Sequence, residues 1–423
     1  MASKIETIFV QIAVYRDPDL LNTLKDILDK AEQPENLRFG ITWQHSPEDE
    51  WDNLDEYLKD ERFRILDVPH DESMGACWAR NLLQQLYSGE TYTLQIDSHT
   101  RFIDNWDTEL KNEHKRLVKK GIKKPLLTSY APSFEPDNDP DSRVQKPWRM
   151  DFDRFSPDGN VHFLPSTIDD ADERTEPVPA RFYSAHFAFA KGEFVKEVPH
   201  DPQYYFHGEE ISIAVRSYTH GYDLLHPHRI FLWHYYTRRG LKKHWDDHGQ
   251  WGEINKASHA RNRKLFSMDG EVYDPEFFGI YGLGTERTLD DYERYAGISF
   301  SKRGVQQHTL SKIDPPCPVI EDEEEYQNSF SSPFKHCIDI HFDSVPHDDY
   351  DVWAVAFEDE EGNELHREDA LPDEIKRMMT DPDKWCRLWR NFNTVTRPYK
   401  WVVWPHSKKE GWVNRMEGTL YEK

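Results

Sequence analysis

The chain has 423 residues and a formal net charge of −25, and both numbers restrict what the protein can be. Its length is sufficient for two or three domains that each bury a core. The negative charge argues against broad nucleic-acid binding, which requires a basic surface. Charged residues make up 31% and aromatic residues 13% of the sequence, which excludes a disordered chain, and no apolar run approaches the ~20 residues that span a membrane.

The N-terminus and the cysteines predict the compartment. Residues 1–6 lead directly into a strand, so we expect no secretion signal. The four cysteines, Cys77, Cys317, Cys337 and Cys386, are scattered without CxxC spacing, which is typical of reduced thiols. We therefore expect a cytoplasmic protein.

The first ninety residues alternate between strand and helix patterns. Apolar, β-prone runs predict strands at 8–15, 37–43 and 63–68. Helical spacing of apolar residues predicts helices at 20–28 and 76–86. Asp17 followed by Pro18 resembles a helix N-cap with proline in the first turn. This alternation predicts an α/β fold with a parallel or mixed sheet and helices on both faces.

The most informative segment is a short strand at 93–97 that runs into Asp97, Ser98 and His99. Open α/β sheets bind ligands in the loops at the carboxyl ends of their strands. A carboxylate oxygen and an imidazole nitrogen two residues apart can both reach one divalent cation, which would then neutralise a diphosphate. The alternative is that Asp97 caps the next turn and His99 is exposed to solvent.

A second set of chemically informative residues follows further strands. Residues 124–130 and 181–189 have strand patterns, and the Pro- and Asp-rich stretch 131–179 between them is a candidate acceptor-side insertion. His186 is either an acceptor-site residue or a hydrogen-bonded histidine of the sheet.

Gly208, Glu209 and Glu210 form a candidate sugar-binding turn, because glycine lets the backbone come close to a ligand. A helix is expected from Ile211, and the preference of helix N-termini for acidic residues explains at least one of the two glutamates.

The region 235–287 concentrates basic residues in an acidic chain: Arg238, Arg239, Lys242, Lys243, Arg261, Arg263 and Lys264. It is either a lid over a diphosphate, with Gly282 and Gly284 as hinge positions, or a solvated basic helix. A short helix is expected at 288–296, ending at Gly297.

The last quarter of the chain has a different character. Pro315 and Pro316 and the acidic run 321–325 predict a linker, after which 337–342 and 352–357 read as strands. We therefore predict two domains, 1–310 and a small β-rich accessory domain at 311–423. Its many tryptophans either form a core or are exposed to bind glycan or protein.

Several motifs in a fixed order resemble one family. They are Tyr15 to Pro18, Gly75 to Arg80, Ile96 to Phe102, Phe206 to Ser212, Arg216 to Asp223 and Pro227. Over roughly the first 300 residues, this order is similar to the GlcNAc-transferases typified by the cytosolic enzymes that modify hydroxyproline on Skp1, and more distantly to polypeptide GalNAc-transferases.

The resemblance implies a GT-A fold, which is a Rossmann-like nucleotide-binding sheet whose central strand ends in a DxD-like motif. It also implies UDP-GlcNAc as donor, a divalent metal, Mn²⁺ or else Mg²⁺, and retention of the anomeric configuration. Asp97 and His99 then become metal ligands. A third histidine comes from the segment 224–234, where the candidates are His226, His228 and His234; His234 is favoured and His228 stays open.

The remaining site residues are also implied by the resemblance. Arg80 occupies the place of a donor-contacting arginine, although a helix-surface charge is an equal alternative. Arg16 lies near the uracil or ribose of the donor. Glu209 and Glu210 are the candidate catalytic carboxylates.

We therefore predict a metal-dependent retaining glycosyltransferase that moves GlcNAc from UDP-GlcNAc to a hydroxyl of a polypeptide or glycan acceptor, with homo-oligomer formation as a further option. One alternative is a metal-dependent phosphohydrolase or nucleotidyltransferase, but the sequence lacks the dense carboxylate set of a two-metal centre. The other is a non-catalytic module that binds carbohydrate or protein.

Overall fold

The computed structural model describes residues 5–51, 53–238, 240–394 and 396–420. Residues 1–4 of the expected N-terminal segment and Arg239 of the basic region lie outside the described residues. The chain forms two compact units. Unit 1 consists of Met1–Phe152, Phe163–Gly297 and Lys312–Val319. Unit 2 consists of Asp153–His162, Ile298–Ser311 and Ile320–Lys423.

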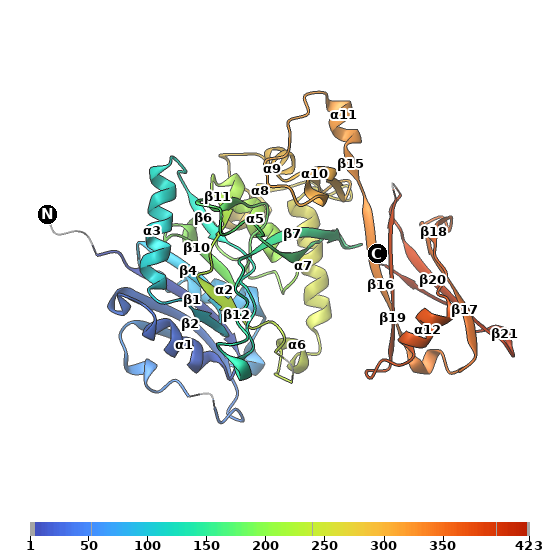
Figure 1. Cartoon of the computed structure of the whole chain (residues 1–423), viewed down its shortest axis with the longest axis horizontal. Helices are drawn as coiled ribbons and strands as arrows, with labels where there is room; N and C mark the ends of the chain where they lie inside the picture. The colour runs from blue at the N-terminus through green and yellow to red at the C-terminus, as the bar shows by residue number, and fades with distance from the viewer. Residues whose placement is uncertain (1–4, 52, 239, 395, 421–423) are drawn as a thin grey trace. The chain divides into compact units, whose positions relative to one another are not determined.

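The centre of unit 1 is an eight-stranded sheet (Figure 1). Its strands are β1 (Ile8–Tyr15), β2 (Leu37–His45), β3 (Phe63–Pro69), β4 (Tyr92–Asp97), β6 (Pro125–Thr128), β9 (Val178–Pro179), β10 (Phe187–Lys191) and β11 (Asp223–His226). They are arranged in the order β3-β2-β1-β4-β10-β6-β11-β9. β3, β2, β1 and β4 are parallel neighbours, whereas β10 is antiparallel to both β4 and β6. The carboxyl ends of β1, β2 and β4 therefore share one edge of the sheet.

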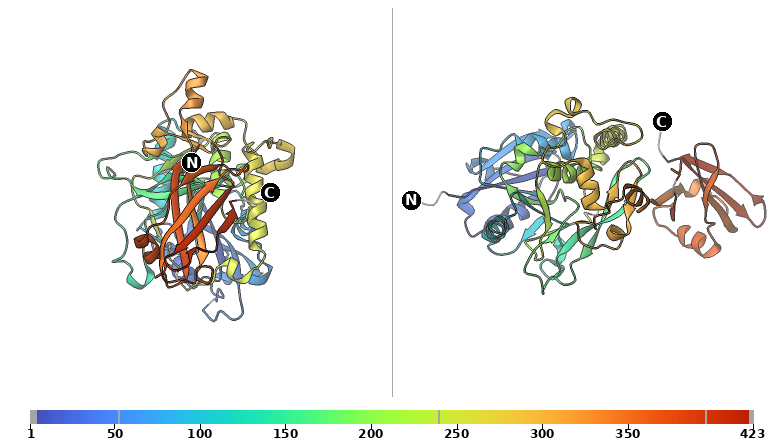
Figure 2. Two further views of the ribbon diagram at one scale, coloured as in Figure 1. Left: turned by 90° about the vertical axis from the view of Figure 1, so that its right-hand side faces the viewer. Right: turned by 90° about the horizontal axis from the view of Figure 1, so that it is seen from above.

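Helices lie on both faces of this sheet (Figures 1 and 2). The helices of unit 1 are α1 (Leu20–Asp29), α2 (Ala76–Gln84), α3 (Trp106–Lys119), α4 (Phe194–Glu197), α5 (Glu209–Thr219), α6 (His244–Asp247), α7 (Trp251–Leu265), α8 (Pro275–Phe278) and α9 (Leu289–Ala296). Alternate residues of β1, such as Val10 and Ile12, pack in one apolar cluster with Leu24 of α1 and Leu110 of α3. On the opposite face, Thr42 of β2 donates a hydrogen bond to a carbonyl of α2.

Three local differences from the sequence predictions have physical causes. The expected strand 181–189 begins only at Phe187, because the amides of Ser184 and Ala185 donate to the side chains of Thr128 and Glu210 and not to a neighbouring strand. The helix expected from Ile211 already begins at Glu209, after Gly208 in a left-handed conformation with φ of 93°.

The third difference concerns the apolar stretch 224–234. It contains two short strands, β11 and β12 (Leu232–His234), and β12 pairs with β5 (Thr100–Phe102) in a separate two-stranded sheet. Pro227 comes directly after β11, where its missing N–H cannot continue the ladder.

Unit 2 is rich in β-structure. Its strands are β13 (Ile298–Ser299), β14 (Gly304–Gln306), β15 (Phe330–Ser331), β16 (Pro333–His341), β17 (Tyr350–Glu358), β18 (Glu364–Arg367), β19 (Trp385–Asn393), β20 (Lys400–Ser407), β21 (Gly411–Trp412) and β22 (Met416–Thr419). Its helices are α10 (Gln307–Leu310), α11 (Glu323–Asn328) and α12 (Pro372–Met378). The adjoining ends of β7 (Trp148–Phe155) and β8 (Val161–Thr167) also belong to it.

Two sheets of unit 2 enclose an apolar core. One has the order β19-β16-β7-β8, and the other has the order β18-β17-β20-β21 with β22 paired to β20. Their inward residues, including Ile338, Trp353, Leu388 and Val403, form one buried cluster. A small sheet of β13, β14 and β15 completes the unit.

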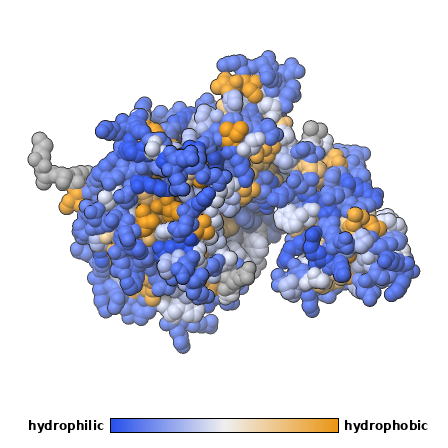
Figure 3. All heavy atoms as spheres, viewed as in Figure 1, coloured by the Kyte–Doolittle hydropathy of each residue, from blue (hydrophilic) through white to orange (hydrophobic). Residues whose placement is uncertain are grey.

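Hydrophilic side chains predominate on the surface shown in Figure 3, where hydrophobic ones form small separate patches. None of the helices in the described part of the chain combines the length and the apolar composition that crossing a membrane requires.

Candidate metal and donor site

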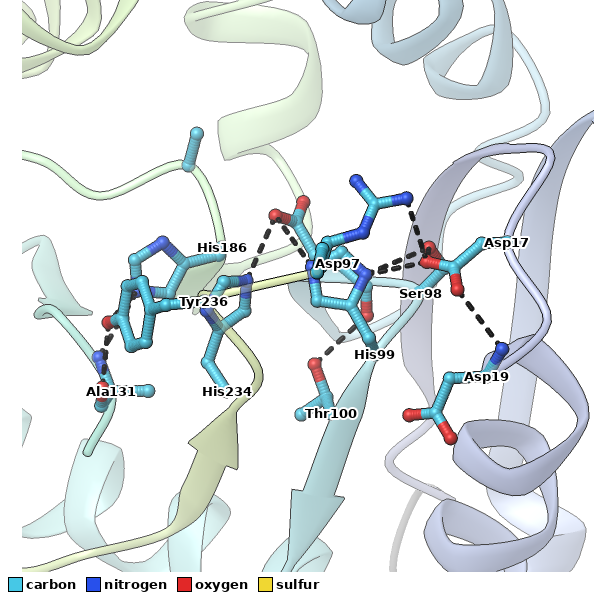
Figure 4. A network of polar contacts seen from close by, with 12 residues as sticks. Asp17, Asp19, Asp97, Ser98, His99, Thr100, Ala131, His186, His234 and Tyr236 are labelled. Carbon is cyan, nitrogen blue, oxygen red and sulfur yellow. Dashed lines mark hydrogen bonds and ion pairs between the residues drawn. The ribbon is translucent and has the colours of Figure 1, made fainter. Parts of the chain in front are cut away.

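Asp97 and His99 lie together at the carboxyl end of β4 (Figure 4). Asp97 is the last residue of the strand, and Nε2 of His99 lies 3.9 Å from its Oδ2 atom. The turn between them is fixed by Thr23 of α1, whose hydroxyl donates to the Ser98 carbonyl and accepts from the Thr100 amide. His99 is only 5% exposed, so the alternative of a solvent-exposed histidine is wrong.

The orientation of His99 is set by Asp17, which follows the end of β1. Nδ1 of His99 lies 2.6 Å from the Asp17 carboxylate, so the ring donates its Nδ1 proton there and directs Nε2 toward Asp97. The same carboxylate accepts from the Ser98 hydroxyl and the Asp19 amide. Burial alone would raise the pKa of Asp17, but His99, the Arg238 charge and the Ser98 hydrogen bond together outweigh it and lower that pKa. Asp17 therefore does not act as the predicted cap of α1, whose N-cap residue is Asp19.

His234 is the histidine of segment 224–234 that reaches this site. It ends β12, and its Nε2 atom lies 3.3 Å from Oδ2 of Asp97. His226 is instead held by the Thr128 carbonyl and the Met150 amide, and no contact of His228 with Asp97 is found among the described residues. Burial lowers the pKa of His234 to about 4, so its ring is neutral near pH 7 and keeps a lone pair for a metal.

An aromatic cluster adjoins His234 (Figure 4). The His186 ring stacks on His234 with centroids 4.3 Å apart, and its Nε2 atom accepts a hydrogen bond from the Ala131 amide. The Tyr236 hydroxyl lies 3.0 Å from the same nitrogen and donates to the Ala131 carbonyl. His186 thus lies beside the site, with its hydrogen bonds made inside the protein.

Arg80 of α2 connects Asp97 with Glu209. Its guanidinium lies 3.1 Å from Oδ1 of Asp97 and forms a second ion pair with Glu209. Burial raises the pKa of Glu209, but the Arg80 charge together with the contacts of His200 and Cys77 overcomes this and lowers the pKa to about 2. Arg80 is 6% exposed, which contradicts the alternative of a helix-surface charge.

Glu209 has two further neighbours that explain why it is fixed. The Cys77 thiol lies 2.7 Å from Oε2 of Glu209, and Nδ1 of His200 lies 3.4 Å from the same oxygen. His200 in turn contacts the side-chain oxygen of Gln95 through Nε2 at 2.6 Å. Glu209 is therefore an anchor of Arg80 and is not directed at an open site.

Glu210 differs from Glu209 although they are adjacent. It accepts a hydrogen bond from the Ala185 amide, and no cation pairs with it among the described residues. Burial raises the pKa of Glu210 to about 8, with a further increase from the charge of Glu209. A carboxyl group with this pKa is largely protonated at pH 7 and can donate a hydrogen bond.

Arg16 lies at the end of β1, with a left-handed backbone of φ 44°. Its guanidinium forms ion pairs with Asp49 at 2.8 Å and with Asp247 of α6 at 3.0 Å. The Tyr15 hydroxyl also donates to Asp247. The beginning of the basic region is therefore attached to the end of β1. Further along the region, Arg261 is buried and forms an ion pair with Asp201. This burial contradicts the alternative of a fully solvated basic helix.

The side chains of Asp97, His99 and His234 fit a divalent cation. One ligand atom from each lies within 4.8 Å of the others. They offer one hard oxygen and two borderline nitrogens, a set that suits first-row divalent metals. The carboxylate that orients His99 is the typical outer partner of a metal-binding histidine, and Nδ1 of His234 is buried with no hydrogen-bond partner among the described residues.

The sequence model of the family "Glycosyltransferase (GlcNAc)" matches residues 7–61 and 51–302. This match covers more than half of the chain. The chain belongs to the GlcNAc glycosyltransferase family. The predicted family is thereby confirmed. The predicted α/β fold of GT-A type is confirmed as well, with a parallel-rich sheet, whose strand β4 ends at Asp97, and additional β-rich sheets.

Two kinds of solved structure are similar to this family member. GalNAc-T7 with UDP, GalNAc and Mn²⁺ is 14% identical with a TM-score of 0.46, and the match covers 69% of this chain and 56% of that one. TarS 1–349 of S. aureus in complex with UDP-GlcNAc is 11% identical with a TM-score of 0.35, and the match covers 59% of this chain and 64% of that one. The chain thus spans less than two thirds of each. No curated protein matches the sequence significantly.

Sequence patterns missed several residues of this candidate site. Asp17 was visible only as a helix cap, because its contact with His99 depends on the pairing of β1 with β4. Cys77 and His200 become relevant only through their contacts with Glu209. For Tyr236, the only signal in the sequence is its position two residues after His234.

Proposed function

We propose that this chain is a metal-dependent, retaining N-acetylglucosaminyltransferase that uses UDP-GlcNAc and acts on a hydroxyl of a polypeptide or glycan. The observation that carries the proposal is the meeting of Asp97, His99 and His234 at the end of β4 in a chain that belongs to the GlcNAc glycosyltransferase family. The cluster of Asp97, His99 and His234 and the ion pair of Arg80 with Glu209 count against a non-catalytic module. The family match counts against a phosphohydrolase.

Asp97, His99 and His234 would hold the divalent metal, which we propose to be Mn²⁺, with Mg²⁺ as the alternative. When bound, the metal would supply Lewis-acid stabilisation of the charge that develops on the UDP leaving group. Asp17 keeps His99 in the tautomer with a free Nε2 atom, and burial keeps His234 neutral. Both effects prepare nitrogen lone pairs before the donor arrives.

Arg80 and Arg16 are proposed to act on the donor side. Arg80 carries a fixed positive charge beside Asp97, and Glu209 prevents its side chain from rotating away. Such a preorganised cation stabilises phosphate charge without reorganisation during the reaction. Arg16 lies at the same edge of the sheet, where it would border the nucleoside and keep α6 attached to β1 through Asp247.

Retention is proposed to proceed by attack on the same face of the sugar, with the leaving phosphate helping to take the acceptor proton. Glu209 is a weak candidate nucleophile, because Arg80, Cys77 and His200 occupy its carboxylate. Glu210, protonated near pH 7, is instead suited to donate a hydrogen bond to a sugar hydroxyl. We therefore assign Glu210 to sugar binding and Glu209 to positioning Arg80.

Further parts of the proposal rest on the sequence arguments. We propose residues 1–310 as the glycosyltransferase domain and 311–423 as an accessory domain. The scattered positions of the four cysteines, without CxxC spacing, favour work in the cytoplasm, and a homo-oligomer stays one option for its assembly.

The proposal is tested by incubating the protein with a panel of UDP-sugars and Mn²⁺ and measuring released UDP. We expect release with UDP-GlcNAc that exceeds release with the other UDP-sugars and that is lost in Asp97→Ala. Hydrolysis that does not depend on the sugar would support the phosphohydrolase alternative. An absence of release with every donor would support the non-catalytic alternative.

A further inference from the structure

Two large tryptophan side chains are exposed on one face of β19. Along this strand, Cys386 and Leu388 point into the core of unit 2, whereas Trp385 and Trp389 are 39% and 49% exposed. Trp353 of the same unit is fully buried and shows the ordinary role of this residue type in a small β-core. The two outward indoles lie outside that core. Trp385 contacts the His341 ring, and Arg154 and Lys335 approach the Trp389 ring, so the exposed remainder of each indole can contact a ligand.

β19 lies beside β16 in unit 2 (Figure 1). The register of this pair places polar side chains around the two indoles. The directly opposed pairs are His341 with Trp385, Asp339 with Arg387, Cys337 with Trp389, and Lys335 with Asn391. Because opposed residues share a face of the sheet, this surface alternates aromatic rings with hydrogen-bonding groups. We call it the tryptophan face.

The charges of the tryptophan face are balanced within unit 2. Arg387 lies 2.7 Å from Asp381 and 3.9 Å from Asp339. Lys335 lies 2.9 Å from Asp153 and over the Trp389 ring at 5.4 Å. A face that stacks nucleic-acid bases on aromatic rings would need net positive charge to hold the phosphates. The pairing of these cations therefore favours a ligand without charge.

The composition of the face also argues against a protein partner. Arg387 stands between Trp385 and Trp389 on the strand, so the indoles do not join into one apolar patch. The centres of protein interfaces are depleted of Lys and Asp, and both occur on this face, as Lys335 and Asp339. Aromatic rings separated by polar side chains suit a ligand that is itself apolar on one side and polar at its edge.

We infer that the tryptophan face binds a neutral oligosaccharide, with the C–H faces of sugar rings on Trp385 and Trp389 and hydroxyl groups bonded to Arg387, Asp339 and Asn391. The two tryptophans are four residues apart, which is roughly 13 Å along a strand. This is longer than one sugar ring, so the ligand spans several sugar units. The inference does not rest on the proposed transfer reaction, because every residue named belongs to unit 2.

The test uses the full chain and three uncharged probes: cellohexaose, chitohexaose and maltohexaose. Isothermal titration calorimetry would measure binding to wild type and to the double variant Trp385→Ala/Trp389→Ala. We expect at least one probe to bind, with affinity at least about tenfold lower in the double variant. The single variant Trp389→Phe keeps a ring and should retain most of the affinity.

A matched control is available on the other sheet of the same unit. Trp404 and Trp412 are 40% and 46% exposed, and their rings lie 5.1 Å apart. Trp404→Ala/Trp412→Ala removes the same chemistry and should leave the affinity unchanged. Thermal unfolding of every variant shows whether unit 2 stays folded.

Four results would overturn the inference. They are no binding of any probe to wild type, equal binding by the double variant, equal loss in the control, or a change in oligomeric state in the double variant that marks a contact between copies. The outcome is independent of UDP release. If the probes bind but no UDP-sugar is turned over, the proposed function fails and the inference stands.

Discussion

Replacing Asp17 by Asn should weaken metal binding although no proposed metal ligand is replaced. The Asp17 carboxylate uses one oxygen for the Asp19 amide and the other for His99 and Ser98. An amide has a single oxygen, so Asp17→Asn cannot keep both sets of bonds. Removing the outer partner of a metal-binding histidine typically reduces affinity about 10- to 100-fold, which corresponds to about 1.4–2.7 kcal/mol.

The assay is a Mn²⁺ titration by calorimetry in the presence of UDP, together with kcat/KM as a function of Mn²⁺ concentration. Activity of Asp17→Asn should recover partly at high Mn²⁺. Asp19→Asn is the matched control, because Asp19 is similarly buried in the same loop but pairs with Arg101. It should lose stability and keep its Mn²⁺ affinity. Equal Mn²⁺ affinity of Asp17→Asn and wild type would refute the assigned role of Asp17.

Two further predictions concern the paired glutamates. Glu209→Gln removes the charge that anchors Arg80, so kcat should fall at least about tenfold with a smaller change in KM for UDP-GlcNAc; an unchanged kcat in a folded variant would show that Arg80 needs no anchor. In the presence of a metal chelator, the folded protein holds a proton on Glu210 that the unfolded chain releases, because burial raises the pKa of Glu210 from 4.5 to about 8. Stability should therefore fall as pH rises from 4.5 through 8, and Glu210→Gln should make thermal unfolding less dependent on pH in this range; equal slopes would contradict the assignment.

Local patterns were sufficient for most of the sheet. The predicted strands at 8–15, 37–43, 63–68 and 93–97 correspond to β1, β2, β3 and β4, because each is a short run rich in apolar and β-prone residues. The helix predicted at 288–296 is α9, with Thr288 accepting from the Asp291 amide and Gly297 left-handed at its end. Both kinds of signal depend only on residues that are close together in the sequence.

Other features depend on contacts between distant residues and were not accessible in the same way. The amides of Ser184 and Ala185 donate to side chains of β6 and α5. The local sequence pattern cannot predict these partners. The choice among His226, His228 and His234 required the split of one apolar run into β11 and β12. Likewise, Glu209 and Glu210 look equivalent in the sequence, and only their contacts distinguish them: Glu209 with Arg80, Cys77 and His200, and Glu210 with the Ala185 amide.

The most direct test of the central claim is the position of the metal. Crystals of the protein with Mn²⁺ and UDP-GlcNAc should give one anomalous peak at the Mn²⁺ absorption edge, within coordination distance of Asp97, His99 and His234 and of the diphosphate. A peak elsewhere, with these three side chains bound only to protein, would contradict the account.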